Sequence, residues 1–149
     1  MKIAVASDER APLTDHVAQW LQAQGHDITL CGALADGQPT PWPLSSVELA
    51  ERVASGECEQ GVLFCYTGTG ASIAANKVPG IRAALCADAP TAQGARRWNH
   101  ANVLVLSYRA TSETVADEIL TAWFYAPPGE GEDADMAAQL AEIERKYSR

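Results

Sequence analysis

The stretch GVLFCYTGTGASIAANK, residues 61–77, is the part of the chain that decides the fold. Its apolar run from Val62 to Phe64 predicts a buried strand, and Cys65 follows where that strand is expected to end. A loop with two glycines comes next, and an Ala-rich segment at 71–77 predicts the start of a helix. This order of elements is typical of anion-binding sites, because a helix start offers unpaired N–H groups and glycines allow close backbone approach.

Cys65 is a candidate base, because it is expected at the edge where open α/β sheets bind ligands. Several N–H donors beside a thiol favour the thiolate, which can accept a proton. A lone cysteine at a strand end is more commonly a packed apolar residue, however, and glycine-rich turns also occur without ligands. The stretch also lacks the Gly-Lys-Ser/Thr ending of a phosphate-binding loop and the spacing of a dinucleotide fingerprint. The residues alone therefore leave both interpretations open.

Composition indicates a globular protein of a single domain. The chain has 149 residues, of which 47% are hydrophobic and 20% charged. A net charge of -8 disfavours nucleic acids and anionic membrane surfaces, and no apolar run approaches the ~20 residues of a membrane span. The cysteines show no CxxC spacing, so we expect neither a zinc site nor disulfides, and a cytoplasmic location; they are Cys31, Cys58, Cys65 and Cys86.

Strand and helix patterns alternate along the chain. Short apolar runs predict strands at 2–7, 27–31, 61–65, 81–86 and 101–106. Apolar residues at helical spacing, with capping and breaking residues, predict helices from Pro12 to about Gly25 and at 45–54, 71–77, 91–98, 112–124 and 135–147. The proline-dense stretch 32–43 is expected to form a loop.

This alternation predicts an α/β fold with three layers, in which a doubly wound, Rossmann-like sheet of five parallel strands has the order 2-1-3-4-5. Cys65 is then expected at the carboxyl edge of the middle strand. One domain spans residues 1–149, with the α/β core at 1–126 and a linker and helix at 127–149. The last helix follows the helix-breaking stretch Pro127-Pro128-Gly129 and has its own apolar stripe. We therefore expect it to pack on a partner chain.

The chain resembles the family of ribose-5-phosphate isomerase B and galactose-6-phosphate isomerase. The resemblance runs from residue 1 to about 123 and is carried by Ser7-Asp8, the loop at 65–70, SIAANKVPGIRAALC at 72–86, Asn99, ANVL at 101–104 and Arg109. It implies an isomerase that interconverts an aldose and a ketose of a sugar or sugar phosphate through a cis-enediolate, without metal or cofactor. It also implies a homodimer, or a tetramer made of two dimers, with the active site at the dimer interface.

The resemblance also implies roles for residues of this chain. Cys65 is expected to move the proton between C1 and C2, with Thr67 as a second catalytic residue, while loop N–H groups bind the enediolate oxygen. Asp8 is expected to bind substrate hydroxyls, and Asn99 and Arg109 to come from the partner chain. The expected substrate-binding residues are Asp8, Glu9, Tyr66, Gly68, Thr69, Gly70, Trp98, Asn99 and Arg109.

Several positions depart from the family pattern. Glu9 and Trp98 stand where the family usually has histidines, and Tyr66 replaces the first loop glycine. Trp42-Pro43 replaces a tyrosine-proline pair, and the stretch GEGEDADM at 129–136 replaces the arginines that hold the phosphate. These changes predict a shorter or acyclic sugar, such as a tetrose derivative, in place of ribose 5-phosphate. Two alternatives stay open: a non-catalytic family member, and a sugar-binding subunit that has lost turnover.

Overall fold

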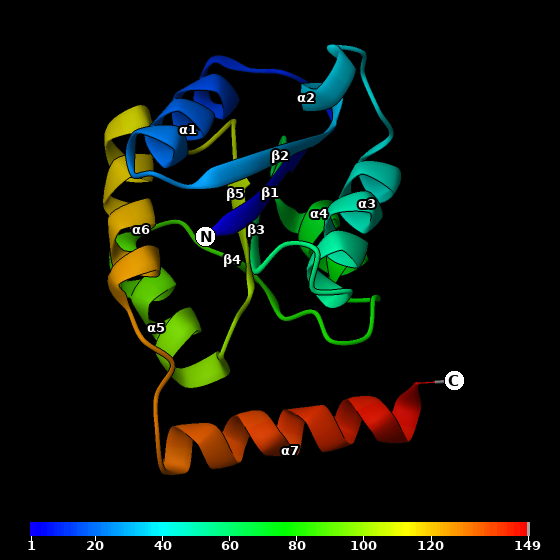
Figure 1. Cartoon of the computed structure of the whole chain (residues 1–149), viewed down its shortest axis with the longest axis vertical. Helices are drawn as coiled ribbons and strands as arrows, with labels where there is room; N and C mark the ends of the chain where they lie inside the picture. The colour runs from blue at the N-terminus through cyan, green and yellow to red at the C-terminus, as the bar shows by residue number, and fades with distance from the viewer. Residues whose placement is uncertain (149) are drawn as a thin grey trace.

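The computed structural model describes residues 1–148, in which one central sheet is covered by helices (Figure 1). The strands are β1 Lys2–Ser7, β2 Asp27–Gly32, β3 Gln60–Cys65, β4 Ala83–Leu85 and β5 Val103–Ser107. The helices are α1 Pro12–Ala23, α2 Ala33–Asp36, α3 Trp42–Ala54, α4 Thr69–Ala75, α5 Ala89–Asn99, α6 Glu113–Tyr125 and α7 Glu132–Tyr147. Among these residues, no helix combines the length and apolar character needed to cross a membrane.

The sheet is entirely parallel, as the sequence predicts, but its strand order differs from the prediction. The order is β2-β1-β3-β5-β4, so the expected order 2-1-3-4-5 is wrong in its last two places. The physical reason lies in the two strands themselves. β5 (VLVLS) is buried along its whole length, whereas β4 has three residues and is only partly buried. The longer and more apolar strand therefore takes the inner position, and β4 becomes the edge.

Three layers are present, because the two faces of the sheet carry separate cores. Helices α1, α5 and α6 cover one face, which Val62 and Phe64 of β3 share with the fully buried Trp123 of α6. Helices α3 and α4 cover the other face, where Leu63 and Cys65 of β3 pack. This alternation along one strand directs the Cys65 side chain toward the α3 and α4 side of the sheet.

The proline-dense stretch is more regular than expected. Its first part forms the short helix α2, and α3 begins at Trp42, before the predicted start at Ser45 or Ser46. Both serines are buried inside the helix and donate hydrogen bonds to the carbonyl oxygen of Trp42, at 3.2 and 2.6 Å. Pro43 fits the first turn because that turn needs no N–H donor from it.

Helix α7 lies apart from the two helical layers, beneath the sheet in Figure 1. Its contact with the body is anchored by Glu144, whose carboxylate accepts a hydrogen bond from the Gly80 N–H at 3.0 Å. The apolar stripe predicted for this helix stays largely exposed at Met136, Leu140 and Ile143. The packing of α7 on a partner chain remains a prediction.

Candidate active site

Cys65 is the last residue of the central strand β3, as predicted, and only 6% of it is exposed. The backbone N–H of Gly68 donates a hydrogen bond to the Cys65 sulfur at a distance of 3.1 Å. Gly68 has a φ of +85°, and a Cβ at this position would lie 2.5 Å from Cδ1 of Leu85. A glycine is therefore required for the loop to turn its N–H toward the sulfur.

Parallel pairing brings three strand ends together around this cysteine. Cys65 pairs with Ser107 of β5, and Phe64 pairs with Ser7 of β1, so both neighbouring strands end at the same edge. The hydroxyl of Ser107 donates to the carbonyl oxygen of Tyr66 at 2.7 Å, which fixes the loop after Cys65. The next residue after β1 is Asp8. The edge therefore combines a thiol, a carboxylate and a constrained loop.

A cavity of about 310 Å³ opens at this edge. Its lining contains most of the predicted site residues and Trp42: Asp8, Trp42, Cys65, Tyr66, Thr67, Thr69 and Gly70. Trp42 packs against Gly70, where a Cβ would lie 3.1 Å from the indole ring. The hydroxyls of Thr67 and Thr69 are hydrogen-bonded to each other at 2.9 Å. The cavity is thus small, lined by aromatic rings on its sides, and polar beside the sulfur.

Arg109 also lies at this edge, although the resemblance assigned it to the partner chain. Its backbone N–H donates to the carbonyl oxygen of Tyr66 at 3.2 Å. Its guanidinium carbon lies 6.0 Å from the centre of the Tyr66 ring, which is a cation–π contact. Arg109 therefore stands beside the loop of its own chain.

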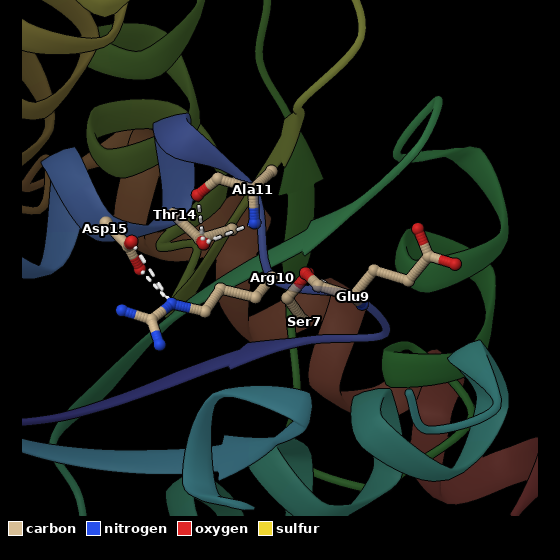
Figure 2. A network of polar contacts seen from close by, with 6 residues as sticks. All are labelled: Ser7, Glu9, Arg10, Ala11, Thr14 and Asp15. Carbon is tan, nitrogen blue, oxygen red and sulfur yellow. Dashed lines mark hydrogen bonds and ion pairs between the residues drawn. The ribbon is translucent and has the colours of Figure 1, made fainter. Parts of the chain in front are cut away.

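Besides Gly68 and Arg109, three predicted residues do not line the cavity. Glu9 is exposed, and Figure 2 shows its side chain extending away from the ion pair of Arg10 and Asp15, whose atoms are 2.9 Å apart. The hydroxyl of Ser7 donates to the Glu9 carbonyl oxygen at 2.5 Å, so the backbone is what holds Glu9 in place. Trp98 and Asn99, at the end of α5, are exposed and do not line the cavity that contains Cys65.

A larger cavity of about 450 Å³ lies between α7 and the part of the chain that contains β4 and the end of α5, away from Cys65. Asn99 lines it together with Leu140 and Ile143 of α7. Its lining contains neither Cys65 nor the glycine-rich loop, so of these two cavities only the smaller one contains the candidate base.

Tyr108 is a residue of this edge that the sequence did not indicate. Its hydroxyl donates a hydrogen bond to Oδ1 of Asp8 at 3.2 Å. Burial, and then the negative charge of Asp8, raise the pKa of Tyr108 well above its usual value. Only the position of Tyr108, directly after the last strand and before Arg109, could have indicated it.

The fold and this edge define a class of protein: a doubly wound α/β protein in which a thiol and a carboxylate meet at the carboxyl ends of parallel strands, where such folds bind their ligands. Comparison with known proteins agrees with this class. The family model described as Ribose/Galactose Isomerase matches residues 3–140. The chain belongs to this family.

Individual relatives are similar over most of the chain. The D-erythrulose-4-phosphate isomerase of Pectobacterium atrosepticum is 34% identical over 147 residues, which cover 98% of this chain and 97% of that protein. A 4-deoxy-4-sulfo-D-erythrose isomerase of a Clostridium species is 36% identical over 107 residues, which cover 71% of this chain and 67% of that protein. The solved ribose-5-phosphate isomerase B of Clostridium thermocellum superimposes with a TM-score of 0.93 at 38% identity, covering 99% of this chain and 100% of that one. The predicted class of enzyme, an aldose–ketose isomerase, is thereby confirmed at the level of the family.

Proposed function

We propose that this protein interconverts the aldose and ketose forms of a four-carbon sugar phosphate or a close acyclic analogue, with Cys65 as the base. The observation that carries the proposal is the hydrogen bond from Gly68 N–H to the Cys65 sulfur, at 3.1 Å, within a cavity that also contains Asp8. A thiolate accepting this bond is ready to take a proton from the carbon beside the substrate carbonyl.

The reaction needs one base and no external oxidant or reductant. From the aldose, Cys65 takes the C2 proton, and the electron pair forms the C1–C2 double bond of an enediolate with negative charge on O1. The thiol then returns its proton to C1, while the O2 proton moves to O1 and C2 becomes the carbonyl carbon. Loop N–H groups between Tyr66 and Gly70 are suited to bind the negative oxygen, because they are fixed before the reaction begins.

The size of the cavity favours a short substrate. Tyr66 and Trp42 both line the cavity beside Cys65. Tyr66 adds an aromatic ring where the family usually has a glycine, and Trp42 places a larger ring where the family has a tyrosine. An acyclic sugar also needs no acid to open a ring, which fits Trp98 at a position where the family usually has a histidine. Two of the relatives carry names that refer to four-carbon sugars, an erythrulose phosphate and a sulfo-erythrose.

The proposed assembly is a homodimer, or a tetramer of two dimers, in which each cavity is completed by the neighbouring chain. The support is the position of Trp98 and Asn99, which are exposed and outside the cavity of their own chain. The exposed apolar stripe of α7 gives the partner a surface to cover. The four free, buried thiols suit a reducing compartment, and we place the enzyme in the cytoplasm.

The test is a panel of four- to six-carbon aldoses and ketoses, free and phosphorylated, scored in heavy water by exchange of the C2 proton of each aldose and of a C1 proton of each ketose. We expect D-erythrulose 4-phosphate to exchange faster than ribose 5-phosphate. Cys65→Ser should lower the exchange rate by about 10²–10⁴, because a serine hydroxyl is too weak an acid to act as the base near neutral pH. Cys58→Ser is the matched control, since it changes a buried thiol outside the cavity and should keep the rate.

Thiol labelling gives an independent readout. Burial raises the pKa of Cys31 to about 11 and that of Cys86 to about 12, so both stay protonated at pH 8. We expect iodoacetamide to modify Cys65 ahead of these two, and bound sugar to protect it. Turnover that survives Cys65→Ser would remove Cys65 from the mechanism, and sugar binding without any exchange would indicate a binding protein.

A further inference from the structure

Tyr108 links Asp8 to the loop that follows Cys65. The roles proposed above for Cys65 and Asp8 do not involve this contact. Its hydroxyl lies 3.2 Å from Oδ1 of Asp8, 100 positions earlier in the chain. Its ring meets the ring of Tyr66 edge to face, with centres 5.9 Å apart and planes at 65°. One side chain therefore contacts the carboxylate through its hydroxyl and the loop after Cys65 through its ring.

The Asp8 carboxylate depends on this contact for its orientation. Among residues 1–148, no other side chain or backbone donor forms a hydrogen bond with it. The backbone of Asp8 is fixed separately, because its carbonyl oxygen accepts from the Thr40 N–H at 2.9 Å. Rotation of the side chain is thus limited by Tyr108, which occupies Oδ1 and leaves Oδ2 as an acceptor for a ligand.

The chemistry of the phenol suits this task. Burial, and then the charge of Asp8, raise the pKa of Tyr108. The phenol is therefore protonated across the neutral range. A protonated phenol donates continuously to the carboxylate, and a hydrogen bond to a charged group is stronger than one between neutral groups.

We propose that Tyr108 is a positioning residue, which holds the Asp8 carboxylate in the orientation that binds the hydroxyl groups of the sugar. This inference rests on the proposed function, because it assumes that Asp8 binds substrate. The hydroxyl of Tyr108 acts through Asp8, whereas its ring packs against Tyr66 independently of the hydroxyl.

Tyr108→Phe is the test, because it removes the hydroxyl and keeps the ring. With the fastest sugar of the panel above, we expect kcat/KM to fall about 10-fold, which is the usual effect of losing a hydrogen bond to a charged group. The loss should appear mainly as a higher KM, since Asp8 binds the same hydroxyl before and during the reaction. Tyr125→Phe is the matched control, because Tyr125 is 76% exposed at the end of α6 and should be neutral.

A double-mutant cycle with Asp8→Ala separates positioning from a general structural effect. If Tyr108 acts through Asp8, Tyr108→Phe should change nothing further once Asp8 is alanine. If Tyr108 supports the Cys65 loop instead, the same substitution should lower kcat equally in both backgrounds. Sugar affinity is also measured by protection of Cys65 from iodoacetamide, so the cycle can be closed when turnover is very slow.

The outcomes distinguish this inference from the proposed function. An unchanged KM in Tyr108→Phe, with Asp8→Ala strongly impaired, overturns the positioning role and leaves the proposed function in place. Full activity of Asp8→Ala overturns the assigned role of Asp8 and the positioning role with it. A coupled loss in both single variants, with no further loss in the double variant, supports both.

Discussion

Gly68→Ala perturbs the turn that brings a backbone N–H to the sulfur of Cys65. Gly68 has a φ of +85°, which costs an alanine about 1–2 kcal/mol. The added Cβ would also lie 2.5 Å from Cδ1 of Leu85, and overpacking of this kind typically costs about 1–3 kcal/mol. Leu85 is 38% exposed and can turn away, so we expect the lower part of that range.

The combined loss is therefore about 2–4 kcal/mol in the free energy of unfolding. For a chain of this length it corresponds to a fall in Tm of about 5–15 °C. Thermal unfolding followed by circular dichroism measures this change. Exchange of the substrate proton in heavy water should also slow by at least about 10-fold, because removal of a single fixed donor to a reacting centre typically costs more than that.

Two matched variants divide the loss into its parts. Gly25 has the same φ of +85°, and a Cβ added there would meet no atom within 4 Å, so Gly25→Ala isolates the backbone cost and should leave exchange unchanged. Adding Leu85→Ala to Gly68→Ala should recover only the steric part of the loss. A Gly68→Ala protein as stable as the wild type would refute the backbone argument. Full exchange activity in a destabilised Gly68→Ala protein would refute the role of the N–H.

Two further predictions concern pH and assembly. Burial, and then the amino group of Met1, lower the pKa of His26, so the unfolded chain binds a proton more readily than the folded one. The free energy of unfolding should therefore fall as the pH drops through 6.5. Denaturant titrations between pH 8 and pH 5 should show a smaller fall for His26→Gln than for the wild type. Equal falls in the two proteins would contradict this. In a dimer with shared cavities, mixing Cys65→Ser subunits with Asn99→Ala subunits should restore exchange, because one site of each mixed dimer is intact. No recovery between subunits shown to exchange by sedimentation would count against shared sites.

Local patterns in the sequence are sufficient to predict the elements that set up the site. Strand β3 and the position of Cys65 follow from one apolar run and the glycines after it. The sequence also predicts a cap of α6 at Thr111 or Ser112, and Ser112 is the residue that accepts a hydrogen bond from the Val115 N–H, at 3.1 Å. These features depend on residues close together in the chain, which is the range over which spacing and capping rules apply.

Features that depend on distant residues could not be predicted in the same way. The order of β4 and β5 is decided by how well each strand fills an inner position, and both read as short apolar runs. The bond from Tyr108 to Asp8 joins residues 100 positions apart, and no local motif marks either as the partner of the other. The start of α3 at Trp42 was not predicted, because prolines disrupt the interior of a helix and a proline-dense stretch indicates a loop. A proline fits the first turn of a helix, however.

The place of β5 between β3 and β4 has a consequence for the synthesis of the chain. Residues 83–85 leave the ribosome before the strand with which they pair, and β3 keeps one side open until residues 103–107 emerge. An unpaired strand side is a template for pairing with other chains. A nascent chain that stops before residue 103 lacks both the strand beside Cys65 and Tyr108. The sheet beside Cys65 therefore closes only after β5 has been synthesised, and we expect translational pausing in this interval to leave the open side of β3 available for pairing with other chains.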